Sequence, residues 1–123
     1  MDKEITKTKI VYNFLLRLDE SSRKHIRSKN LSVLLKIHEH DIIDILGNLT
    51  MLGVINRVYR FYCPITGNGI TDILFRPFPE TIYCDVCNEE HSTLSNPLSA
   101  VYQLNDIKML ENLNNYLYEW DWA

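Results

Sequence analysis

The stretch Leu49-Thr50-Met51-Leu52-Gly53-Val54-Ile55 marks the end of a helix and the start of a strand. Apolar residues at three- and four-residue spacing predict a helix over 41–52. Gly53 is typical of a residue that ends a helix, and the β-branched and aromatic run over 54–62 predicts a strand. The predicted buried side of this helix consists of Ile42, Ile45, Leu46, Leu49 and Leu52.

Two further helices are predicted before this junction, over 4–18 and 31–37. Asn30 is a suitable N-cap for the second of them, because its side chain can accept a bond from a free backbone N–H. The apolar stripe of the first consists of Ile10, Val11, Phe14, Leu15 and Leu18, and that of the second of Leu31, Leu34 and Leu35.

Shorter elements are predicted after the junction. A turn around Gly67-Asn68-Gly69 separates the strand over 54–62 from a second strand over 70–75. Short strands follow over 81–83 and 100–104. Asp106 can cap a last helix over 107–120, whose apolar stripe consists of Ile107, Leu110, Leu113, Leu117 and Trp120.

Three helices followed directly by a hairpin resemble a winged helix-turn-helix domain over roughly residues 5–76, with Leu49–Ile55 carrying the resemblance most clearly. The expected fold class is α+β, with three helices, a β-hairpin wing, a zinc-ribbon-like β element and a C-terminal helix. The expected divisions are a winged-helix core over 1–62, a wing and ribbon-like element over 63–105, and the helix over 106–123, all in one compact unit.

Two cysteine motifs resemble the knuckles of a zinc ribbon. Cys84-Asp85-Val86-Cys87-Asn88 places two thiolates on one turn, where they can reach the same ion. Cys63-Pro64-Ile65-Thr66-Gly67 looks like the other knuckle, with Thr66 in the place of its second cysteine. The resemblance implies one structural Zn²⁺.

A closed structural zinc site has four ligands, and the chain has three cysteines. His91 lies four residues after Cys87 and can complete a Cys3His site as a neutral imidazole. The alternative is a ribbon that has lost its metal, with the cysteines packed as small apolar residues. The predicted ligands are Cys63, Cys84, Cys87 and His91.

Composition limits the class of protein. The 123 residues include 13 Lys and Arg and 16 Asp and Glu, so the net charge of −3 argues against a generally basic nucleic-acid coat protein. The apolar runs are too short to span a membrane, and the sequence MDKEITKTKI lacks the apolar core of a signal peptide. We therefore expect a cytoplasmic protein with reduced cysteines. We also expect no enzymatic activity, because no catalytic signature surrounds any cysteine.

Basic residues concentrate near the beginning of the chain. Residues 1–30 contain eight Lys and Arg against four Asp and Glu, centred on SSRKHIRSKN over 21–30. This stretch is either a solvated surface or a phosphate-contacting patch. The nucleic-acid-binding candidates for a winged helix are Arg23, Lys24, Arg27, Lys29, Lys36, Asn48, Arg57 and Arg60.

Two functions remain open. The preferred one is a zinc-stabilised, non-catalytic adaptor or accessory subunit that binds a protein partner or a second copy of itself. By analogy of modules alone, such proteins resemble accessory components of bacterial multi-gene systems, including defence. The alternative is a DNA-binding transcriptional regulator, although Asp41 and Asp44 predict weak duplex binding. No membrane and no small-molecule substrate are expected. The aromatic candidates for partner contact are Tyr116, Tyr118, Trp120 and Trp122.

Overall fold

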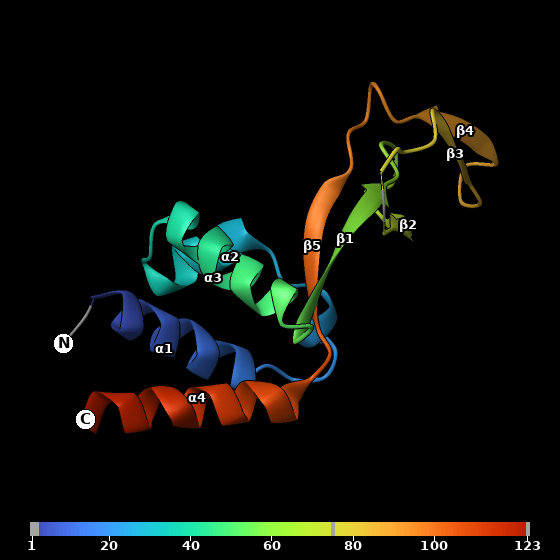
Figure 1. Cartoon of the computed structure of the whole chain (residues 1–123). Coiled ribbons are helices and arrows are strands. Elements are labelled where there is room, and N and C mark those ends of the chain that lie inside the picture. The colour runs from blue at the N-terminus through green and yellow to red at the C-terminus, as the bar shows by residue number, and fades with distance from the viewer. Residues whose placement is uncertain (1–2, 75, 123) are drawn as a thin grey trace. The chain divides into compact units, whose positions relative to one another are not determined.

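The computed structural model describes the backbone of residues 3–74 and 76–122 and the side chains of residues 5–74 and 76–118. Within this part, the chain is mixed α+β, with four α-helices and two small antiparallel sheets (Figure 1). The elements in order are α1 (Lys3–Leu16), the 3-10 helix η1 (Ser22–Lys24), α2 (Ser28–Leu35), α3 (Glu39–Met51), β1 (Ile55–Tyr62), β2 (Gly69–Ile73), β3 (Thr81–Cys84), β4 (Glu89–Ser92), β5 (Ser99–Leu104) and α4 (Ile107–Trp122).

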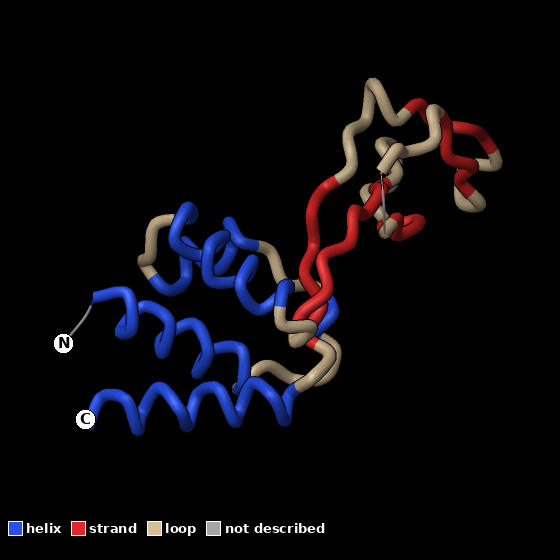
Figure 2. Tube along the Cα trace, in the orientation of Figure 1, coloured by secondary structure: helices blue, strands red, loops and turns tan. Residues whose placement is uncertain are grey.

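Contacts divide the chain into two units, which are described separately below. The first unit comprises Met1–Asn56 and Tyr102–Ala123, and the second comprises Arg57–Val101. Helices α1 to α4 all belong to the first unit, whereas β2, β3 and β4 belong to the second (Figure 2). Strands β1 and β5 begin in one unit and end in the other.

The predicted helices and the predicted glycine stop are present. Gly53 has a φ of +78°, and the Val54 N–H donates to the Leu49 carbonyl, so the chain leaves α3 as expected. The prediction for Asn30 was wrong, because α2 begins at Ser28 with extended Arg27 before it and Asn30 lies within the helix. The Ser28 hydroxyl instead donates to the Glu39 carboxylate, 2.9 Å away on α3.

An apolar core fills the first unit. It combines residues from α1, α2 and α3 with Tyr102, Leu104 and Leu110 from the end of the chain. Three residues that were predicted to lie on apolar faces are instead exposed: Leu34 (65%), Leu52 (49%) and Ile10 (41%). Helix α2 has only eight residues, so its buried face is narrow and Leu34 lies beside it. Leu52 follows the last residue of α3 as its C-cap.

Polar side chains join α1 to α4, which lie side by side within the first unit (Figure 1). The side-chain amide of Asn13 donates to the Tyr118 hydroxyl at 3.0 Å, and the side-chain amide of Asn114 donates to Oδ1 of Asn13 at 3.1 Å. The Lys9 ammonium lies 4.6 Å from the centre of the Tyr118 ring. These contacts fix the C-terminal half of α4 against the first helix.

The segment between η1 and α2 forms an isolated backbone bridge to β5, which was not predicted. The Ile26 N–H donates to the Tyr102 carbonyl at 3.0 Å, and the Tyr102 N–H donates to the Ile26 carbonyl at 2.7 Å. Only one residue of the η1–α2 connection, Ile26, takes part in this bridge. A strand of one residue has no alternating apolar pattern, so the sequence could not indicate it. The bridge ties the η1–α2 connection to β5.

The five strands form two small antiparallel sheets. In the sheet with order β2-β1-β5, Tyr59 pairs with Ile73 and Phe61 with Thr71. Strands β3 and β4 form a separate hairpin in which Ile82 pairs with His91. Strand β4 was not predicted, because its sequence EEHS has low strand propensity. No helix in the described part of the chain combines the length and apolar character that a membrane span requires.

Candidate metal centre

The first cysteine follows directly after β1. Cys63 is buried, and its backbone closes a tight turn through two bonds of 2.8 Å. Its N–H donates to the Asn68 carbonyl, and its own carbonyl accepts from the Gly67 N–H. The Thr66 N–H points at the Cys63 sulfur, 3.4 Å away. The turn therefore has the form expected of a knuckle, with one sulfur and one N–H directed at it.

The second knuckle connects β3 to β4. Cys84 is the last residue of β3, and Cys87 lies in the turn that follows. The Asn88 N–H donates to the Cys84 carbonyl at 2.8 Å, and Asn88 adopts a left-handed φ of +56°. Asparagine tolerates this conformation better than most residues, which explains the type of residue that follows Cys87.

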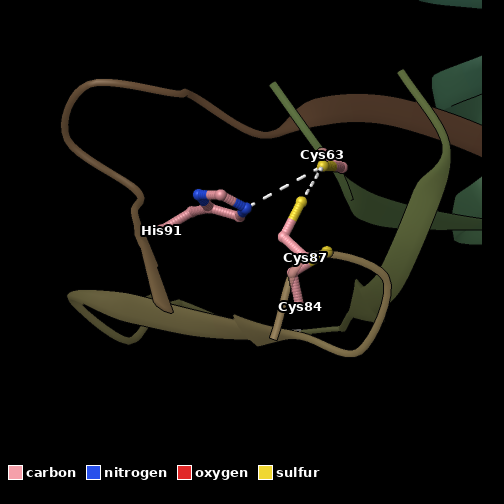
Figure 3. Close-up of side chains that lie close together, drawn as sticks. All are labelled: Cys63, Cys84, Cys87 and His91. Atoms are coloured by element: carbon pink, nitrogen blue, oxygen red, sulfur yellow. Dashed lines mark hydrogen bonds between the residues drawn. The ribbon is translucent and has the colours of Figure 1, made fainter. Parts of the chain in front are cut away.

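His91 enters the site from β4. Its position opposite Ile82 directs the imidazole toward Cys63, and its Nε2 lies 3.8 Å from the Cys63 sulfur (Figure 3). The buried ring of Phe61 stacks on the imidazole, with 6.2 Å between ring centres and 25° between planes. This packing holds the histidine ring in its orientation.

The four predicted ligands converge within the second unit. The sulfurs of Cys63 and Cys87 are 3.3 Å apart, and all four ligand atoms lie within 4.8 Å of one another (Figure 3). Cys63, Cys84 and His91 are buried, and Cys87 is half-buried. In a tetrahedral zinc site with Zn–S bonds of about 2.3 Å, two sulfurs lie about 3.8 Å apart. The sulfurs of Cys63 and Cys87 would therefore need to separate only slightly to admit a metal ion.

The electrostatics of the site favour one thiolate at neutral pH. Hydrogen bonding from Thr66 lowers the pKa of the Cys63 thiol to about 6. Hydrogen bonding with Cys63 raises the pKa of Cys87 to about 12. Together these shifts describe a Cys87 thiol that donates to a Cys63 thiolate. Three sulfurs and an imidazole are a donor set suited to a soft or borderline divalent metal, and the residues therefore fit a metal ion.

Other residues near the cluster have different roles. The Thr66 hydroxyl accepts a bond from the Asn68 N–H at 3.3 Å, and Thr66 is not among the four clustered ligands. Glu89 and Glu90 are exposed on β4 opposite Cys84 and Tyr83. The neighbouring Tyr83 hydroxyl donates to the Asn88 side chain at 3.2 Å.

The basic candidates of the first unit lie on η1, on α2 and near their ends. Lys24, Lys29 and Lys36 are exposed, whereas Arg23 and Arg27 are half-buried. Asn48 is exposed on α3. The exposed positions beside it on α3 include His40, Ile43, Asp44 and Met51, with no Lys or Arg on that helix. Asp41 is half-buried and paired with Lys7 at 2.9 Å.

The two basic candidates of the second unit differ from each other. Arg60 is only 9% exposed, and its guanidinium binds the Asp72 carboxylate at 2.7 and 3.1 Å. The Asp72 bond raises the pKa of Arg60 further. Arg57 is exposed on β1, with its guanidinium carbon 5.6 Å from the centre of the Tyr59 ring.

The aromatic candidates lie on α4. Tyr116 is 58% exposed, and Tyr118 is partly exposed but bound to Asn13. The side chains of Trp120 and Trp122 lie outside the described residues.

An apolar cleft in the first unit was missed by sequence reasoning. It has a volume of about 240 Å³ and lies between the end of α1, η1 and the outer side of α2. Leu34 lines this cleft and is exposed, but its helical spacing in the sequence had assigned it to the core, so no sequence signal indicated the cleft. The apolar lining consists of Phe14, Leu18, Ile26, Leu31 and Leu34, and His25 and Arg27 are among its polar residues.

Comparison with known protein families, curated proteins and solved structures found no match to this chain.

Proposed function

We propose that this protein is a zinc-stabilised, non-catalytic adaptor with a winged-helix-like first unit. The observation that carries the adaptor function is the apolar cleft beside α2, whose lining includes the largely exposed Leu34. The Cys3His cluster carries the zinc assignment.

The order of elements supports a winged-helix arrangement for the first unit. Helices α1, α2 and α3 precede β1, which is hydrogen-bonded to β5, and the Ile26–Tyr102 bridge adds a short third pairing. In this interpretation the residues between β1 and β5 are an enlarged wing that contains the metal cluster.

The donor set supports zinc in a structural role. Cys63, Cys84, Cys87 and His91 would supply all four ligands of a structural zinc ion, which would leave no position for a substrate or a reactive water. Zinc bound in this way stabilises a fold without performing a reaction. This is the basis for proposing that the protein is not an enzyme.

The cleft supports a protein partner more than a small molecule. Its volume of about 240 Å³ is below the roughly 300–1,000 Å³ of typical small-molecule sites. Such a cleft suits an apolar anchor side chain from another protein. Because Arg27 lines the cleft and the basic residues Lys24 and Lys29 are close to it in sequence, the proposed partner is an amphipathic helix with acidic residues beside its apolar anchor.

A duplex-binding regulator is the weaker proposal. In helix-turn-helix proteins the second helix of the motif reads the major groove, and that helix would be α3 here. Its exposed positions combine Asn48 with an exposed carboxylate at Asp44 and lack a cation that could neutralise phosphate.

The adaptor proposal is tested with a photo-crosslinking amino acid at position 34 in cells that produce the protein. A crosslinked partner that presents an acidic amphipathic helix is expected from position 34 but not from position 94, since Leu94 is exposed in the second unit. Leu34→Glu should then weaken the purified complex by about tenfold or more, because it places a charge in an apolar contact.

The matched control is Val33→Glu. Val33 neighbours Leu34 on α2, is similarly exposed, and does not line the cleft, so the complex should retain its affinity. Equal losses from both variants would reject the cleft as the docking site. Tight, sequence-selective duplex binding at physiological salt that is lost in Asn48→Ala would establish the regulator instead.

A further inference from the structure

A second group of side chains in the second unit lies apart from the metal cluster. Tyr59 and Phe78 have ring centres 5.0 Å apart at an angle of 59°. The guanidinium of Arg76 lies 5.4 Å from the centre of each ring, and that of Arg57 lies 5.6 Å from the Tyr59 ring. These distances are within the range of cation–π contacts. We call these four residues the arginine–aromatic cluster.

Local structure brings the four residues together. Arg57 and Tyr59 are two positions apart on β1, so they lie on the same face of the strand. Arg76 and Phe78 come from the connection between β2 and β3. The Thr93 hydroxyl anchors that connection by donating to the Pro79 carbonyl at 2.7 Å.

No acid in the described part of the chain forms an ion pair with Arg57 or Arg76. Asp72, the acid on the adjacent strand, is already bonded to Arg60. Among the residues that the structure describes, neither exposed arginine forms an ion pair. Glu80, an acid two positions after Phe78, is not bonded to either of them. The cluster therefore presents two positive charges beside two half-buried rings.

We propose that the arginine–aromatic cluster binds single-stranded nucleic acid. The edge of a guanidinium can donate two parallel bonds to a phosphate, and its plane and the neighbouring rings can stack with unpaired bases. Contact with the rings also limits the rotamers of both arginines before binding, which reduces the entropy lost on binding.

The pairing of two positive charges with two aromatic rings favours a single strand over an acidic peptide or a duplex. An acidic peptide would use the two charges but would gain nothing from stacking on the rings. A duplex would offer phosphates but would keep its bases stacked inside the helix. A single strand is the polyanion that uses both features of the cluster.

The test measures fluorescence anisotropy of a labelled oligothymidine of about 12 nucleotides with the full, zinc-loaded chain. Arg57→Gln/Arg76→Gln should weaken binding about tenfold or more. It should also reduce the slope of log affinity against log salt by roughly 1.4, which is about 0.7 for each of two lost phosphate contacts. Phe78→Leu should weaken binding several-fold with an unchanged salt slope, because stacking does not release counterions.

The matched control is Arg17→Gln/Lys108→Gln, which removes two exposed charges from the first unit and should change the affinity less than twofold. Zinc content of every variant confirms that the second unit is intact. The proposal is overturned if the wild type does not bind the strand, or if the Arg57/Arg76 variant binds as well as the wild type. It is equally overturned if the control loses as much affinity, or if a duplex or a polyglutamate peptide binds more tightly than the single strand.

Discussion

The two units of this protein bury different kinds of side chain. The first unit buries a continuous set of aliphatic residues from three helices and from the segment around Leu104 and Leu110. The second unit buries few ordinary apolar side chains, among them Val58, Phe61 and Ile82. Its other deeply buried positions include Cys63, Cys84 and His91, which belong to the proposed zinc site.

The difference indicates that the units depend on different forces. A unit of fewer than about 70 residues rarely gains enough stability from its apolar core alone, and small units commonly add a metal. Burial of aliphatic surface can stabilise the helices of the first unit by itself. We infer that the second unit depends on its metal and that the first does not.

The largest expected effect follows from Cys84→Ser. Structural zinc contributes on the order of 10 kcal/mol to folding, and the buried Cys84 sulfur is one of the four proposed ligands. In a ¹⁵N–¹H correlation spectrum, signals from residues 57–101 should lose their dispersion while those from α1, α2 and α3 keep theirs. Thr71→Val is the control and should retain zinc, because Thr71 is exposed on β2 and lies outside the ligand cluster. If the signals of residues 57–101 keep their dispersion in the Cys84 variant, the second unit does not depend on a metal and the proposed difference between the units is refuted.

A smaller effect, of about 2–5 kcal/mol, is expected from Leu46→Ala, because this fully buried leucine would leave a cavity in the first unit. Urea unfolding followed by circular dichroism at 222 nm measures the loss, and metal analysis should still find one zinc per chain. Val33→Ala is the control on an exposed position and should change the free energy of unfolding by less than about 0.5 kcal/mol. Loss of zinc together with helix stability in the Leu46 variant would mean that the units unfold together.

The smallest expected effect concerns Asp41 on α3. A hydrogen bond from Lys7 lowers the pKa of Asp41, with smaller favourable contributions from Lys7, His40 and His38 charges. The ionised carboxylate therefore stabilises the first unit fully above the unfolded pKa of about 3.9, and this stabilisation is lost as pH falls through the lower folded value.

Urea unfolding of the wild type and Asp41→Asn at several pH values tests this linkage. The two proteins should differ in stability near pH 6 and should converge at the acid end of the series. Repeating the pair in a Lys7→Met background should remove most of the pH-dependent difference. If the stability difference between the wild type and Asp41→Asn instead grows as pH falls, the pKa of Asp41 is not lowered by folding and the prediction is wrong.

Local chemistry explains what could be predicted from the sequence. Gly53 and the Cys84-x-x-Cys87 turn depend on residues close together in the chain, so they indicated the end of α3 and the second knuckle. His91 was also predicted, because ligand chemistry required a fourth donor close to Cys87, although the hairpin that brings it back to the cysteines was not predicted.

Features that depend on distant segments were missed. Leu34 was assigned to the core because helical spacing cannot show how narrow the covered face of α2 is. The Ile26–Tyr102 bridge joins residues that are far apart in the chain and has no local pattern. The arginine–aromatic cluster forms only when the connection after β2 packs against β1, so Arg76 and Phe78 had no distinctive signal.

Metal analysis combined with X-ray absorption of the purified protein tests the central claim most directly. We expect one zinc per chain, with three sulfur ligands at about 2.3 Å and one nitrogen ligand at about 2.0 Å. Chelation of that zinc should remove the fold of residues 57–101 and leave the helices intact. Metal-replete protein that holds less than about a tenth of an equivalent of zinc, with residues 57–101 still folded, would contradict it.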